Sequence, residues 1–138
     1  MTETFSKEER AAMREAAKER KLHLSREESL SLTLARIESM AAQDRELALG
    51  LHKIALTVYP DFEVKTWYGM PAYCLDGKVI VFFQDGEKFK TRYCTVGFQD
   101  AAKLDEGTFW PTSYALSKLT PAVAKEISTL IKRAVGLK

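Results

Sequence analysis

Aromatic side chains near turns and strand ends are the part of this sequence best suited to binding chemistry. Three of them fall within eight positions, in the stretch Thr66–Tyr73, and basic residues follow in a strand-like segment. Aromatic faces beside one or two cations can hold a small anion or an aromatic metabolite. The candidate ligand-binding residues are Trp67, Tyr68, Met70, Tyr73, Lys90, Arg92, Tyr93 and Trp110.

The same aromatic residues also have a purely structural interpretation. Large rings complete the core and the edges of a small sheet, and such packing needs no ligand. The spacing of the residues does not separate the two interpretations, so both stay open at this point.

Covalent catalysis is not indicated by the nucleophiles of the chain. A thiol or hydroxyl needs a base and an orienting group within reach. Cys74 and Cys94 fall in strand-like sequence, whereas His23 falls in a connector and His52 on a polar helix face. The short motifs of serine hydrolases, nucleotide-binding proteins and zinc proteases are missing. Enzymatic activity is left open but is not favoured.

Metal binding has little support in the spacing of the ligand-type residues. A CxxC pair or a Cys/His cluster, as in structural zinc sites, is absent. The carboxylates concentrate at turns, where such residues commonly form the turn itself. Oxygen ligands of this kind permit an iron site without indicating one. They are Asp61, Glu63, Asp76, Asp85, Glu87, Asp100, Asp105 and Glu106.

Length and composition predict one α+β domain over residues 1–138, with residues 1–24 as a possible peripheral N-terminal helix. A chain of this length buries roughly 65–70% of its surface on folding and needs no disulfide. The net charge is +2 and charges of both signs alternate, so no nucleic-acid partner is expected. Without a signal-like or membrane-spanning run, we expect a cytoplasmic protein with free thiols and no membrane partner.

Four segments have helical character. Ser6 with Glu9 and Ser25 with Glu28 form capping boxes, Asp44 is a candidate cap, and Thr120 precedes a proline. The first segment has a thin apolar stripe and should lie on the outside of the protein. The expected helices cover residues 6–20, 26–39, 45–58 and 121–135.

The middle of the chain is strand-like. Asp76-Gly77 is the strongest hairpin signal, and Gly69-Met70-Pro71 predicts a bend. Together these predict an antiparallel sheet of about five strands, packed with the N-terminal helices and the C-terminal helix. The expected strands cover residues 62–68, 72–75, 78–84, 88–98 and 108–116, with turns at 76–77 and 85–87 and a short helical turn at 99–104. Within 88–98, the strand character is best at residues 92–97.

The third strand, KVIVFFQ, is apolar on both faces. A strand with one wet face alternates apolar and polar residues, so this one is expected to be central and covered on both sides. One cover is the helical layer. The other is either the C-terminal segment or the apolar wall of a concave pocket.

Four segments, KTWYGMPAY, DGKVIVFFQ, KFKTRYCTVGF and LDEGTFWPTSYAL, follow one another in this order. With them the chain resembles the YdhG-like family of bacterial proteins of unknown function, from about Asp44 to Arg133. The resemblance implies a small α+β domain with an antiparallel sheet. Members are sometimes labelled iron chaperones because of a likeness to frataxin, so iron is a possible cofactor by family likeness only.

Three functions are compatible with these observations. The first is a non-enzymatic small-ligand-binding protein, with the ligand between the WYGMP bend, the fourth strand and the FWPT segment. The second is an iron-chaperone-like metal binder. The third is a protein-interaction module or a homodimer joined through the edge strand near Trp110.

Overall fold

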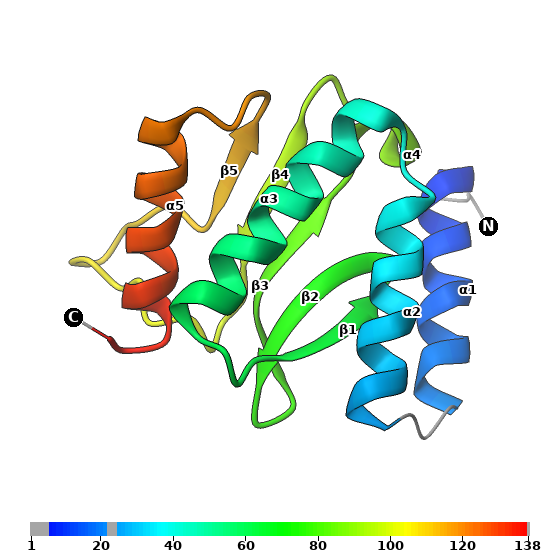
Figure 1. Ribbon diagram of the computed structural model, residues 1–138, viewed down its shortest axis with the longest axis horizontal. Coiled ribbons are helices and arrows are strands. Elements are labelled where there is room, and N and C mark those ends of the chain that lie inside the picture. Colours follow the sequence, from blue (N-terminus) through cyan, green and yellow to red (C-terminus); the bar gives the residue numbers. More distant parts are fainter. Residues whose placement is uncertain (1–5, 22–24, 138) are drawn as a thin grey trace.

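The structure is a computed structural model that describes residues 6–21 and 25–137. Within these residues the chain forms helices around a five-stranded antiparallel sheet of order β1-β2-β3-β4-β5 (Figure 1). His23, expected in a connector, lies outside the described residues. The elements are α1 (Lys7–Lys21), α2 (Arg26–Glu38), α3 (Ala42–Val58), β1 (Glu63–Trp67), β2 (Met70–Leu75), β3 (Lys78–Gln84), α4 (Gly86–Phe89), β4 (Cys94–Phe98), β5 (Ser113–Leu116) and α5 (Pro121–Ala134).

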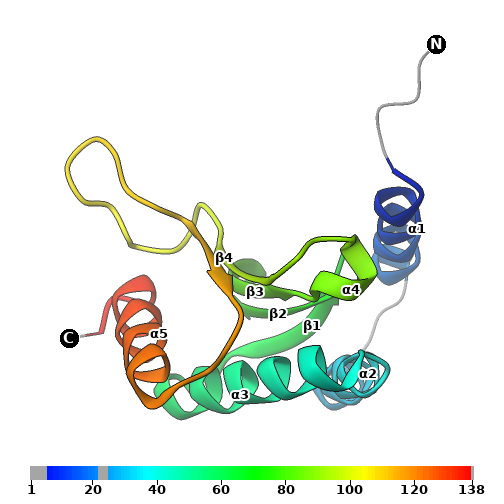
Figure 2. The ribbon, with the colours of Figure 1, turned by 90° about the horizontal axis from the view of Figure 1, so that it is seen from above.

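The helices are distributed unequally over the two faces of the sheet. Helices α2 and α3 lie on one side of it, with α5 at the β5 end, whereas α1 lies near the other end, beside α4 (Figure 2). This is the α+β arrangement expected from the sequence. One face of the sheet is therefore sealed by helices, whereas α1 and the short helix α4 lie at one end of the other face (Figure 2).

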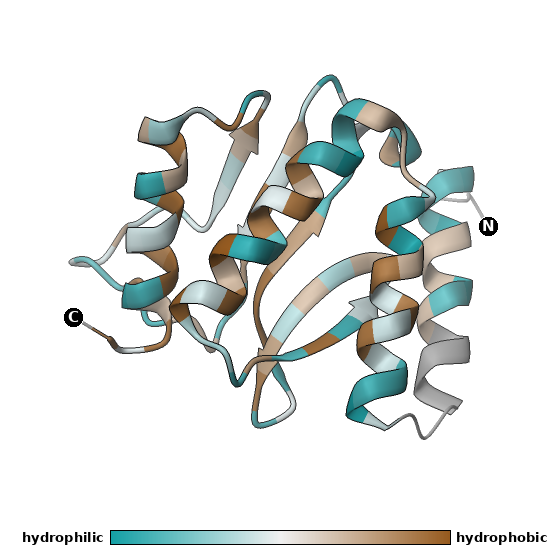
Figure 3. Cartoon of the chain, in the orientation of Figure 1, coloured by the Kyte–Doolittle hydropathy of each residue, from teal (hydrophilic) through white to brown (hydrophobic). Residues whose placement is uncertain are grey.

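The sealed face holds the main core. Val64 pairs with Tyr73, Tyr73 with Val81, and Val81 with Phe98, so these four side chains form one row across four strands. All four are buried. Facing them, the amphipathic helices α3 and α5 carry stripes of apolar residues (Figure 3).

The opposite face of the sheet carries a smaller apolar cluster, in which Trp67 and Phe82 pack against Ala72, Cys74 and Val79. Lys65, Ala72, Phe82 and Gly97 form a row across the same strands. A side-chain carbon on Gly97 would lie 2.2 Å from an atom of the Phe82 ring, so glycine is needed for the ring to lie on the backbone. This confirms that β3 is a central strand with apolar side chains on both faces, as its sequence indicates.

Several local predictions are confirmed because they depend on neighbouring residues only. Both halves of the capping boxes at Ser6 and Ser25 are present. The side chain of Thr120 accepts a hydrogen bond from the Val123 N–H, directly before the proline of α5. Asp76 and Gly77 both have positive φ, as a type I′ hairpin requires.

The predicted turn at 85–87 and the start of the fourth strand at residue 88 are wrong. Residues 86–89 form helix α4, and β4 begins only at Cys94. Gly86 permits this because a side chain there would lie 2.9 Å from the Tyr93 carbonyl oxygen. Lys90 ends the helical turn with a φ of 58°.

Other boundaries also differ from the prediction. β2 begins at Met70, so the bend is Tyr68-Gly69 and Pro71 lies inside a strand. β3 pairs with β2 only from Ala72 onward, so the missing N–H of Pro71 interrupts no ladder to β3. β5 covers only residues 113–116, and α3 begins at Ala42. The short turn expected within residues 99–104 is present, with the Ala102 N–H donating to the carbonyl oxygen of Gln99 at 2.9 Å.

Candidate functional site

A groove of about 710 Å³ lies on the incompletely covered face of the sheet, between α1, the β1–β2 turn and α4. Its apolar lining comes from four parts of the chain: α1, the β1–β2 hairpin, β3 and α4. Polar groups stand among them, including the carboxylate of Glu8 and the ammonium group of Lys90. The apolar side chains of the groove are those of Met13, Trp67, Tyr68, Met70, Phe82 and Phe89.

Three of the four aromatic rings in this lining form two adjoining pairs. The ring centroids of Trp67 and Tyr68 are 5.0 Å apart and nearly perpendicular, at 89°. Those of Trp67 and Phe82 are 5.3 Å apart, at 56°. Because the rings are tilted rather than stacked flat, their edges and faces both contribute to the groove.

The hairpin turn between β1 and β2 sets the direction of the Tyr68 ring. Tyr68 has a φ of 52° and Gly69 a φ of 75°, the positive pair of a type I′ turn. A tyrosine with positive φ is uncommon and costs about 1 kcal/mol or more. The side chain is 36% exposed, so burial in the core does not offset this strain.

A buried ion pair holds the hairpin turn in place. Nε of Arg36 donates to the carbonyl oxygen of Gly69 at 2.8 Å, and its Nη2 donates to Oδ1 of Asp85, also at 2.8 Å. The side chain of Asp85 is only 3% exposed. Arg36 thus ties the turn that carries Tyr68 to the residue that precedes α4.

Helix α1 covers the groove through a thin contact. Ala12 and Ala16 are buried, but Met13 is 42% exposed. Glu15 pairs with Lys88 of α4 at 2.8 Å. Both charged groups lie directly over Gly69, where an added side-chain carbon would come within 2.6 Å of each. The absence of a side chain at Gly69 therefore lets α1 approach the hairpin.

The charges at the groove are not all matched. Hydrogen bonding with Ser6 lowers the pKa of Glu9, which keeps this carboxylate negative. Glu8 and Lys90 make no ion pair with any other residue that the structure describes. A bound molecule can therefore meet one carboxylate and one ammonium group without displacing an ion-pair partner among the described residues.

The structure separates the eight residues that the sequence suggested as one site. Trp67, Tyr68, Met70 and Lys90 line the aromatic groove. Lys90 also lines a second depression, together with Arg92 and Tyr93. Trp110 lines a third, of about 240 Å³, under the loop after β4. A ligand between the WYGMP bend and the FWPT segment is therefore not supported by the geometry.

Tyr73, the eighth of these residues, belongs to the core. It is fully buried, and its hydroxyl oxygen lies 2.9 Å from Nδ1 of His52, within hydrogen-bonding distance. Its partner His52 was expected on an exposed face of the helix, but it is only partly exposed. The signal for this lies in Ala48 and Ala55, four residues before and three after His52, which are both buried.

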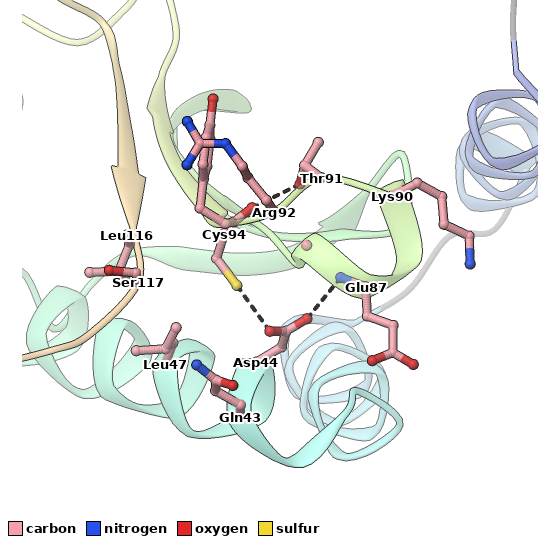
Figure 4. A pocket seen from close by; sticks show the side chains of 12 residues that line it. Gln43, Asp44, Leu47, Glu87, Lys90, Thr91, Arg92, Cys94, Leu116 and Ser117 are labelled. Carbon is pink, nitrogen blue, oxygen red and sulfur yellow. Dashed lines mark hydrogen bonds between the residues drawn. The ribbon is translucent and has the colours of Figure 1, made fainter.

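The second depression, of about 450 Å³, surrounds a carboxylate that the sequence suggested only as a helix cap. Oδ1 of Asp44 accepts a hydrogen bond from the Cys94 thiol at 3.3 Å, and Oδ2 accepts one from the Glu87 N–H at 3.0 Å. Both bonds converge on Asp44 in Figure 4, while the Lys90 side chain points away. Burial, above all, raises the pKa of Cys94 to about 12. The thiol is thus protonated, and the cluster joins α3 to α4 rather than supplying a nucleophile.

Acid should destabilise the protein through His52. Burial lowers the pKa of this imidazole below its ordinary value. The unfolded state then takes up the proton first, so stability is present above about pH 6.5 and is lost as the pH falls towards the folded-state pKa. In urea titrations at pH values between about 7 and 5, His52→Gln should show a shallower loss of stability than the wild type. An unchanged pH profile would contradict this role.

Iron, implied by the family resemblance, finds no matching ligand set in the part of the chain that the structure describes. No group of three or more His, Cys, Asp or Glu side chains there could hold a metal ion. Asp85, one of the turn carboxylates, is already used by Arg36.

Comparisons with known proteins add no neighbour: no family model, curated protein or solved structure matches the chain. The YdhG-like resemblance therefore stays a prediction, and the function must be argued from the groove itself. Among the described residues, no helix is long and apolar enough to cross a membrane.

Proposed function

We propose that this protein reversibly binds a small, flat and largely apolar organic molecule in the groove beneath α1. The observation that carries the proposal is the convergence of four aromatic rings and two methionines on an open volume of about 710 Å³. Small-molecule sites typically measure about 300–1,000 Å³ and combine apolar walls with a few polar groups. The groove has this size and this composition.

The lining indicates how such a ligand would be held. A planar ring could stack against Trp67 or Phe82, since tilted aromatic pairs accept a further ring at their faces. Met13 and Met70 have unbranched side chains that adapt to different ligand shapes. Lys90 and Glu8 at the same groove would orient polar substituents of the ligand.

Two features favour this interpretation over simple core filling. Tyr68 keeps a strained backbone although its ring is partly exposed, and a residue needed only for packing would be buried. Met13 also remains exposed at the groove rather than closing it. Strain and exposed apolar surface at one place are typical of binding sites.

Removing the indole of Trp67 should weaken ligand binding strongly. Ligands are first sought by a thermal-shift screen of planar aromatic fragments. For those that bind, Trp67→Ala should reduce affinity by roughly 10- to 100-fold, because a buried aromatic contact contributes about 1.5–3 kcal/mol. The dissociation constant is measured by calorimetry with wild type and variant.

Fluorescence locates the bound fragment. Trp67 and Trp110 are the two tryptophans of the chain, so Trp110→Phe leaves the groove indole as the only strong reporter. Fragment binding should quench the fluorescence of Trp67 in this variant. The dissociation constant of the fragment should be the same as for the wild type. Tyr93→Ala, in the second depression, is the matched control and should also leave affinity unchanged. The proposal fails if no planar fragment binds, or if bound fragments are insensitive to Trp67→Ala.

A further inference from the structure

The third depression, at the base of the loop between β4 and β5, shares no lining residue with the aromatic groove. Its walls come from the two limbs of this loop, within residues 98–105 and 110–112, and enclose about 240 Å³. The loop extends away from the sheet in Figure 2. Sites for drug-sized ligands measure about 300–1,000 Å³, so this smaller depression matches a small head group.

The floor of the depression is apolar, and one wall is an indole. Phe98 and Leu104 line it and are buried. Trp110 is half-buried and packs against the main core. The N–H of Phe98 donates to the carbonyl oxygen of Thr112 at 2.8 Å, which joins the two limbs of the loop. A ligand would therefore meet walls that are already in place, at a low cost in conformational freedom.

The rim of the depression carries negative charge without a partner of opposite charge. Asp100 and Asp105 both line the depression and are exposed. Neither carboxylate makes an ion pair with another residue that the structure describes. Within that part of the chain, no group of three or more His, Cys, Asp or Glu side chains could hold a metal ion. The charge therefore suits an organic cation, which needs no shell of coordinating oxygens, rather than a metal ion.

Two basic side chains of the same region are engaged elsewhere. Lys103 lies beside Gly136, where an added side-chain carbon would be 3.3 Å from its Nζ. Arg133 pairs with Glu106 at 3.4 Å. Neither Lys103 nor Arg133 lines the depression. The structure thus places these cations away from the two aspartates and leaves the depression acidic.

We propose that this depression binds a small molecule through a methylated ammonium group. A cation over an aromatic face is attracted by the ring quadrupole, and tryptophan gives the strongest attraction, so Trp110 is the expected contact. The methyl groups donate no hydrogen bonds and suit the apolar floor of Phe98 and Leu104, whereas an unmethylated ammonium would lose its water there. Asp100 and Asp105 supply the opposite charge at the rim.

Titration with choline and with neohexyl alcohol, in which a carbon atom replaces the choline nitrogen, tests the proposal. The two molecules have the same shape and differ in charge. In Trp67→Phe, Trp110 is the remaining tryptophan and reports binding by fluorescence. Choline should give a saturable change, and neohexyl alcohol should bind about tenfold more weakly or less tightly still. Equal affinity for both molecules overturns the proposal, as does a choline titration that shows no saturation.

Potassium chloride at the same concentrations controls for ionic strength. If it gives the same saturable change in Trp110 fluorescence as choline, the depression binds simple cations and the proposal is wrong. The titrations use no groove ligand, and the groove indole is absent from the Trp67→Phe protein. Failure of choline binding therefore leaves the function proposed for the aromatic groove untouched, and the reverse also holds.

Three substitutions, compared by calorimetry with choline, locate the binding. Asp105→Asn removes one rim charge and should weaken affinity about fivefold. Trp110→Leu keeps an apolar side chain without the ring quadrupole and should weaken it about tenfold. Glu106→Gln, at the neighbouring carboxylate outside the depression, is the matched control and should leave affinity unchanged. Circular dichroism checks that each variant is folded. Unchanged affinity in folded Asp105→Asn and Trp110→Leu would place choline elsewhere and overturn the proposal.

Discussion

Replacing Asp85 with alanine is expected to lower the free energy of unfolding by about 3–5 kcal/mol, because it leaves the charge of Arg36 buried without its partner. The Asp85 side chain is 3% exposed and that of Arg36 is 14% exposed, so water can solvate the remaining guanidinium only poorly. Urea denaturation followed by circular dichroism measures the loss. Affinity for a groove ligand should fall as well, since Arg36 also holds the carbonyl oxygen of Gly69.

Two comparisons separate this effect from a general sensitivity to charge removal. The pair between Arg133 and Glu106 is long, at 3.4 Å, and exposed, so Glu106→Ala should cost about 0.5 kcal/mol or less. The double variant Arg36→Met with Asp85→Leu should recover much of the lost stability, because apolar side chains of similar size need no charged partner. If Asp85→Ala lowers the free energy of unfolding by less than about 1 kcal/mol, the Arg36 guanidinium is hydrated in the variant and the prediction is wrong.

Truncating Tyr73 to alanine should cost about 3–5 kcal/mol, the usual effect of removing a large aromatic side chain from a core. The residue is fully buried, and its ring contacts those of His52 and Phe62. Tyr73→Phe keeps the ring and loses only the hydroxyl group near His52, so about 1 kcal/mol is expected. Both losses are measured from urea unfolding curves.

The ligand-binding assay then distinguishes a core role of Tyr73 from a role in the site. Because Tyr73 points to the sealed face of the sheet, Tyr73→Phe should bind groove ligands with unchanged affinity. Trp67→Ala, on the other face, should show the reverse: weakened binding with a smaller effect on stability. If Tyr73→Phe binds groove ligands more weakly, Tyr73 takes part in the ligand-binding site and its assignment to the core is contradicted.

Tyr73 was predicted as a ligand-binding residue but lies in the core, and the reason is geometric. Side chains alternate between the two faces of a strand, so residues three apart in one strand point in opposite directions. Met70 and Tyr73 both lie in β2 and therefore cannot line one face. Because the sequence suggested a strand beginning only at residue 72, with Met70 in a bend, this parity argument was not available for the pair.

Arg92 and Tyr93 lie outside the aromatic groove for a different reason. Helix α4 contains Lys88 and Phe89, which were expected at the start of the fourth strand. What allows it is the tight approach of the Gly86 backbone to the carbonyl groups of Thr91 and Tyr93. A contact of this kind is invisible in the sequence, where Asp85-Gly86 is equally typical of a simple turn.

By itself, the sequence determined the caps of α2 and α5, the Asp76-Gly77 hairpin, the α+β class and the two-sided character of β3. Each of these depends on residues a few positions apart, whose preferences act locally. Only the tertiary structure decided which aromatics share the groove, and that Arg36 finds Asp85 forty-nine positions away. Those outcomes follow from strand register and helix packing, which bring distant residues together through many weak contacts at once.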